Sequence, residues 1–202
     1  MRIFLIIFLT AQLIYSQNNF PKNFFSKPVE IPLVLSGSFG ELRSNHFHSG
    51  IDIKTLAKEG LNIINSADGF VSRIKISHGG FGKALYVSHK NGYTTVYGHL
   101  KKFNNEIENY VKKIQYERKT YEIDIYLVDG RINVYKNQII AFSGNTGSSS
   151  GPHLHYEIRK TLNQKPLNPL LFGMEVKDTR RPEIKNVFVY NNIDKSYNNL
   201  IP

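Results

Sequence analysis

The sequence feature that most constrains the fold is a pair of histidine motifs in different halves of the chain. The first is His48-Ser49-Gly50-Ile51-Asp52, and the second is His153-Leu154-His155, which follows a glycine- and serine-rich run. Both lie in segments with extended rather than helical patterning, in which residues at even offsets point to one face. Each motif can therefore present its polar side chains to one surface. A fold that brought the two surfaces together would create one metal site.

Imidazole and carboxylate groups are the usual ligands of a catalytic zinc ion, which takes three protein ligands and leaves one position for water. The chain has no cysteine. This excludes a disulfide framework, a thiolate zinc site, a cysteine nucleophile and a lipid-anchored cysteine. Short motifs of this kind also arise by chance, but the joint occurrence of two, each beside glycine-rich turns, favours a common site.

The rest of the patterning is rich in β-structure. Ser72, Ile74 and Ile76 alternate with basic residues, as in a half-buried strand. Asn91-Gly92 separates two strand-like segments and predicts a hairpin. The segments expected to be strands are 31–36, 51–55, 61–65, 69–77, 83–89, 93–99, 121–127, 132–135, 138–143 and 153–158. Many short strands with closely spaced turns predict an antiparallel sheet, sandwich or barrel.

Five segments share a pattern with a known family: His48–Ile53, Ala67–Val71, His89–Tyr97, Tyr97–Leu100 and Gly147–Glu157. Through these segments the chain resembles the lysostaphin-type (LytM-like) zinc metallopeptidases, over about residues 35–172. The resemblance implies an all-β fold whose catalytic core is a mainly antiparallel, sandwich-like sheet.

The resemblance also implies a site and an activity. His48, Asp52 and His155 would be the metal ligands for one Zn²⁺ per chain, and His99 and His153 would be the catalytic histidines beside the metal-bound water. The implied function is an exported zinc metalloendopeptidase that hydrolyses peptide bonds in the cross-links or stem peptides of peptidoglycan. The implied partners are therefore peptidoglycan peptides.

One segment departs from the pattern of that family, because extra residues follow His99-Leu100. Phe103, Ile107, Val111 and Ile114 recur at helical spacing, which predicts one inserted helix at about 101–120. The insertion is either a lid or groove wall that contacts substrate or a packed surface decoration. Apolar residues at helical spacing favour the second interpretation.

The ends of the chain suggest processing and a further module. Arg2 and the short apolar run after it predict a signal peptide at 1–16; an uncleaved anchor is the alternative. An extended lead-in is expected at 17–34. Residues 173–202 are expected to be a linker and the start of a further β module, because 182–190 resembles a lone strand. No integral membrane span is expected after signal cleavage, and the mature protein is expected in the periplasm, envelope or extracellular space.

The formal net charge is +10. An exported protein without a nucleic-acid-binding motif is not expected to bind nucleic acid, so the charge suits either an anionic envelope polymer or simple solubility. Two other function classes remain open. One is a catalytically silent LytM-type binding protein that regulates envelope amidases, and the other is a β module that binds carbohydrate or peptide.

The remaining candidates near the site have weaker support. His46 is a candidate rim residue, and Arg43 and Asn45 are candidates for lining the groove. Tyr97 is expected on the same strand face as His99, either bonding near the site or packing. Two further histidines are expected to have no catalytic role: His78 in a loop and His89 as a structural residue or a partner of a metal ligand.

Overall fold

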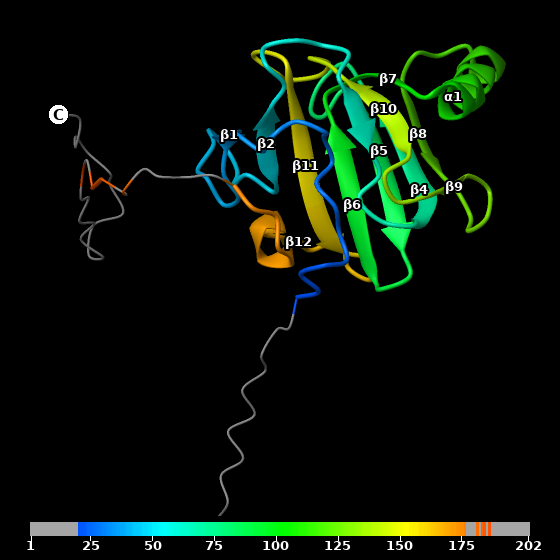
Figure 1. Cartoon of the computed structure of the whole chain (residues 1–202). Helices are drawn as coiled ribbons and strands as arrows, with labels where there is room; N and C mark the ends of the chain where they lie inside the picture. The colour runs from blue at the N-terminus through cyan, green and yellow to red at the C-terminus, as the bar shows by residue number, and fades with distance from the viewer. Residues whose placement is uncertain (1–19, 177–180, 182, 185, 187–202) are drawn as a thin grey trace, which may run out of the picture.

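The computed structural model describes residues 20–176, 181, 183, 184 and 186. The expected signal segment and most of the expected strand at 182–190 lie outside these residues. A large antiparallel sheet dominates the described part (Figure 1). Its strands follow the order β1 (Leu35–Gly37), β2 (Ile51–Lys54), β11 (His153–Lys160), β6 (Tyr93–Gly98), β5 (Lys83–His89), β4 (Gly69–Ile76) and β8 (Ile123–Tyr126), with β12 (Pro166–Leu167) on β11 and β9 (Asn133–Val134) on β4.

A smaller sheet consists of β3 (Asn62–Ile64), β10 (Ile139–Ser143) and β7 (Leu100–Phe103), in that order. One hydrophobic cluster contains buried residues from both sheets. The mainly antiparallel all-β fold predicted from the sequence is therefore confirmed. Among the described residues, no helix is long and apolar enough to cross a membrane.

Alternation along β11 determines how the core and the site share one sheet. Leu154, Tyr156 and Ile158 are fully buried members of the hydrophobic cluster. Residues at odd positions of the strand, beginning with His153 and His155, point to the opposite face. Burying each large apolar side chain contributes roughly 1.5–3 kcal/mol, so a register shift by one residue would exchange the two faces at high cost.

The predicted hairpin is present, and Gly92 takes the positive φ of 80° that its turn requires. The first predicted strand is wrong in extent, because β1 begins only at Leu35. Pro32 has no backbone N–H to donate to a strand partner. Residues 20–34 nevertheless belong to the folded unit, since Phe25 and Val29 are buried in the main cluster.

The inserted helix is α1 (Asn105–Arg118). It begins after Asn104, whose side chain accepts a hydrogen bond from the Ile107 N–H at 3.0 Å. Figure 1 shows α1 at the end of the molecule opposite β1, near β7 and β8. Ile107 and Val111 are buried, as the periodicity predicts. Phe103 is the exception: it lies in β7 and packs in the core from a strand, not from the helix.

His89 makes the stability of the fold depend on pH. Its Nδ1–H donates to the Asp68 carbonyl at 2.9 Å, its Nε2 lies 2.9 Å from Thr95 Oγ1, and its ring packs against Phe25. Burial lowers the pKa of His89 below its ordinary 6.5, although the Asp68 carbonyl opposes this. The folded protein therefore binds fewer protons than the unfolded chain. The stabilisation is fully present above pH 6.5 and decreases as the pH falls through that value.

We expect His89→Gln to lower the free energy of unfolding by about 1–3 kcal/mol at neutral pH, because buried hydrogen bonds are lost. The difference from the wild type should shrink on acidification. Urea unfolding of both proteins with a chelator present, from about pH 8 to pH 5, measures this. A difference that is constant over this range would contradict the assigned role.

Candidate metal centre

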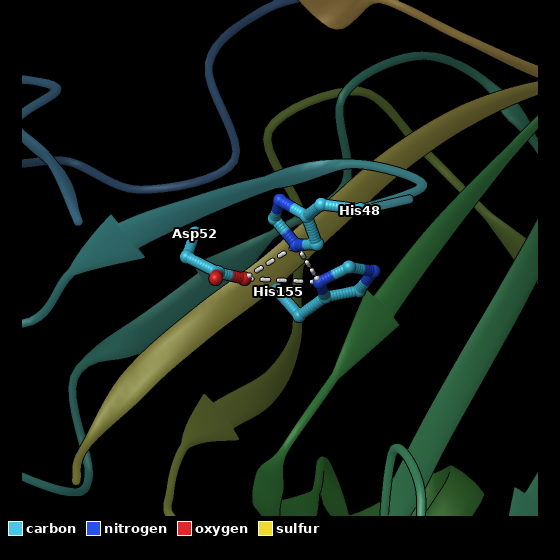
Figure 2. A group of neighbouring side chains, drawn as sticks. All are labelled: His48, Asp52 and His155. Atoms are coloured by element: carbon cyan, nitrogen blue, oxygen red, sulfur yellow. Dashed lines mark hydrogen bonds and ion pairs between the residues drawn. The ribbon is translucent and has the colours of Figure 1, made fainter. Parts of the chain in front are cut away.

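Three side chains from two neighbouring strands and one loop converge on a single point (Figure 2). Asp52 lies on β2, His155 lies opposite it on β11, and His48 lies in the loop before β2. His48 Nε2, His155 Nδ1 and Asp52 Oδ1 are each 3.0 Å from the other two. The centre of such a triangle is about 1.7 Å from each atom, slightly less than zinc bond lengths of ~2.0–2.2 Å. The three donors are therefore close enough together to hold one ion.

The tautomers of His48 and His155 are fixed by groups outside the site. His48 Nδ1 lies 2.9 Å from the Ser38 carbonyl, which can only accept, so Nδ1 carries the proton and Nε2 has a free lone pair. His155 Nε2 lies 2.9 Å from Glu157 Oε1, so Nε2 carries the proton and Nδ1 has a free lone pair. Metal-bound histidines commonly have such acceptors on their other nitrogen. The nitrogens that face the centre are therefore the ones able to bind a cation.

The third donor, Asp52, is held by an arginine. Arg43 Nη2 donates to Asp52 Oδ2 at 2.9 Å, so Oδ1 remains directed at the histidines. Gly37 allows this arrangement, since a Cβ there would lie 2.4 Å from Asp52 Oδ2 and 2.5 Å from Arg43 Nη2. Burial alone would raise the pKa of Asp52, but the neighbouring imidazoles of His153, His155 and His48 lower it well below its ordinary range. Asp52 is therefore an anion at neutral pH.

Glu157 contacts His155 on the side of the ring that faces away from the other two donors. It is fully buried, contacts His155, pairs with Arg159 and accepts a hydrogen bond from Ser49 Oγ at 2.5 Å. Burial alone would raise the pKa of Glu157, but the bonds to His155 and Arg159 lower it to about 2. Glu157 is not among the residues that the sequence predicts at the site. Its position two residues after His155, on the same strand face, is the signal that could have revealed it.

His99 and His153 lie beside the three donors, with their ring centroids 4.6 Å apart. Each donates from Nδ1 to a backbone carbonyl at 2.8 Å, His99 to Thr146 and His153 to Gly151. Each therefore keeps Nε2 free. His153 Nε2 lies 3.5 Å from Asp52 Oδ1.

The environments of these two histidines differ. Burial lowers the pKa of His99 to about 4, so its ring is neutral at pH 7. For His153, burial would lower the pKa, but Asp52 and the Gly151 carbonyl raise it above its ordinary value. Two imidazoles with different proton affinities thus lie next to each other beside the three metal-binding side chains.

The glycine-rich turn before β11 positions His99. Gly147 has φ 77°, and a Cβ there would lie 2.3 Å from Gly82 N, so only glycine allows the two loops to touch. The neighbouring Thr146 bonds through Oγ1 to Leu100 O and Lys83 N. This contact holds the Thr146 carbonyl against His99.

The site opens into a groove of about 1050 Å³. Residues 31–36 and 54–57 contribute one group of its lining residues, and residues 80–81 and 148–153 contribute another. His46 lines the groove, as predicted for a rim residue. Arg43 also lines the groove, as predicted, whereas Asn45 does not. No residue of α1 lines it, although α1 is described throughout. The helix therefore fits a packed decoration and not a groove wall.

Other sequence predictions have mixed outcomes. Tyr97 does not share a face with His99: β6 ends at Gly98, His99 has φ 58°, and Tyr97 is buried in the core with its hydroxyl bonded to Ser66. His89 is structural, as described above. His78 lies in a loop and stacks on Tyr121 at 5.0 Å.

The fold and the donor set define a β-sheet protein with three side chains that could hold one metal ion and a histidine pair beside them. The family model "Peptidase family M23" matches residues 46–116 and 115–169. The chain belongs to this family, which confirms the resemblance to lysostaphin-type peptidases.

The chain has relatives among bacterial proteins. The DD-carboxypeptidase/endopeptidase Mpg of Neisseria meningitidis serogroup B is 34% identical over 129 residues, which are 64% of this chain and 23% of that protein. The peptidoglycan DD-endopeptidase ShyA of Vibrio cholerae is 32% identical over 123 residues, 61% of this chain and 22% of that protein. The chain thus matches about a quarter of the length of these relatives.

Solved structures show the same fold. The catalytic domain of the prophage-encoded M23 protein EnpA from Enterococcus faecalis matches with a TM-score of 0.52 and 25% identity, over 74% of this chain and 98% of that one. A chain of the SpoIIQ–SpoIIIAH pore-forming complex matches with a TM-score of 0.55 and 23% identity, over 75% and 91%.

Proposed function

We propose that this protein is an exported zinc metalloendopeptidase that hydrolyses peptide bonds in the cross-links or stem peptides of peptidoglycan. The observation that carries the proposal is the set of free metal-binding atoms on His48, Asp52 and His155, held in place by hydrogen bonds to groups outside the site. The names of the relatives as metalloproteases and peptidoglycan endopeptidases support the reaction and the substrate. Export to the periplasm or envelope follows from that substrate and from the expected signal segment.

In this proposal zinc, when bound, supplies a Lewis acid that polarises the scissile carbonyl and lowers the pKa of water towards ~7. His99 and His153 transfer the proton and stabilise the developing charge. Each has Nε2 free and Nδ1 anchored on a carbonyl. One ring, neutral, accepts the proton of the attacking water at Nε2, and the other, protonated at Nε2, donates to the carbonyl oxygen and stabilises its charge.

A catalytically silent protein that regulates envelope amidases is the alternative function. The presence of all three donors and both additional histidines favours an enzyme, since a silent binding protein has no need of buried, oriented metal donors. The likeness to SpoIIQ concerns the fold alone and does not favour either function.

The test measures zinc stoichiometry and release of muropeptides from purified sacculi for the wild type and His99→Ala. We expect one zinc per chain in both proteins, because His99 is not a donor, and a loss of release of about 10²–10⁴-fold in the variant. His78→Ala, which changes an exposed histidine in a loop, is the matched control. A wild type without zinc, or one that binds zinc and releases nothing, would support the silent alternative.

A further inference from the structure

Lys54 occupies an unusual place in the groove. It is the last residue of β2, two residues after the ligand Asp52, and therefore on the same strand face. Across the antiparallel pair it lies directly opposite His153. Residues paired in this way have Cβ atoms about 4.5–5.5 Å apart. The Lys54 side chain thus starts next to a catalytic histidine, and Lys54 is exposed and lines the groove.

The charge of Lys54 is not neutralised by the part of the chain that the structure describes. No ion pair within 4.0 Å forms between its ammonium group and a described carboxylate. Asp52 is the one carboxylate among the described groove residues, and Arg43 pairs with it. Arg43 also contacts Glu41, so the positive charge of Arg43 is already balanced by two carboxylates.

The backbone of Lys54 is held in place beside the site. Val34 and Leu56 line the groove beside it, and the Lys54 N–H donates to the Val34 carbonyl at 2.9 Å. Val34 is 50% and Leu56 64% exposed, so water still reaches the ammonium group. A cation whose backbone is anchored in the sheet beside the site favours an anionic group of the ligand over a neutral one.

We propose that Lys54 forms a carboxylate subsite, so that the protein prefers peptides with a free carboxylate close to the scissile bond. The proposal rests on the peptidase function above and specifies its substrate. Lys54 would then be a specificity residue, separate from the zinc donors and from the two catalytic histidines.

The test compares two forms of one substrate: soluble cross-linked muropeptides, and the same preparation with its free carboxylates converted to carboxamides. We expect the zinc-loaded wild type to prefer the carboxylate form in kcat/KM by about tenfold, the size of one charge-assisted hydrogen bond. Lys54→Met should bring this ratio close to one, Lys54→Arg should keep most of the preference, and Lys54→Glu should invert it. Lys90→Met, at the exposed hairpin turn, is the control and should keep the wild-type ratio.

Equal ratios for the wild type and Lys54→Met would overturn the subsite. Binding of both forms, measured by calorimetry, separates this result from a failure of the peptidase proposal. A wild type that cleaves neither form but binds the carboxylate form more tightly, in a Lys54-dependent way, would overturn the peptidase and support the subsite. Equal binding of the two forms by a wild type that cleaves neither would overturn both.

Discussion

Replacing His155 by alanine should abolish zinc binding and peptide hydrolysis together. His155 supplies one of three donors, and two remaining side chains do not make the three-ligand set of a catalytic zinc site. We expect zinc affinity to fall by more than about a hundredfold, beyond the effect of losing a residue that only supports a ligand. Zinc competition with a chelator and muropeptide release measure the two losses.

The variant also removes a ring that stacks on Phe81 at 4.5 Å and leaves the buried Glu157 without one partner. Asp52→Asn is therefore a second variant, because it keeps the volume of the side chain and loses the anionic donor. Unfolding curves establish that each variant is folded, and His78→Ala serves as the matched histidine control. A folded His155→Ala protein with one tightly bound zinc, or with wild-type release, would show that the metal centre is assigned wrongly.

The elements that meet at the site were largely predictable from the sequence. Alternation in β11 and the Asn91-Gly92 turn follow from local rules of side-chain direction and backbone conformation. The convergence of His48, Asp52 and His155 was suggested by residue type and by family resemblance. Spacing alone predicts only that His48 and Asp52 can share one surface and that His153 and His155 can share another.

What the sequence did not reveal depends on the backbone and on long-range contacts. The carbonyls of Ser38, Thr146 and Gly151 orient three of the histidines, and every residue has a carbonyl, so no residue type signals them. The positive φ of His99 breaks the alternation that would have placed Tyr97 beside it. The pairing of Arg43 with Asp52 depends on the course of the loop that carries Arg43.

Glu157→Gln should weaken zinc binding although Glu157 does not face the metal. The carboxylate accepts from His155 Nε2–H and pairs with Arg159, and it is completely buried. A neutral amide is a weaker acceptor and can present its NH₂ group to the ring, which would disturb the tautomer that leaves Nδ1 free. We expect zinc affinity to fall by about 10–100-fold. We also expect a loss of roughly 3 kcal/mol in unfolding free energy, because Arg159 keeps an uncompensated charge.

The double variant Glu157→Gln/Arg159→Gln separates the two effects. Removing both charges should recover much of the stability, since no buried charge is left unpaired, whereas zinc affinity should stay low because His155 still lacks an anionic acceptor. Urea unfolding of the metal-free proteins measures the first quantity, and competition with a chelator measures the second. Glu117→Gln, an exposed change on α1, is the control. Recovery of zinc affinity in the double variant would show that Glu157 acts through the stability of the sheet and not through the histidine.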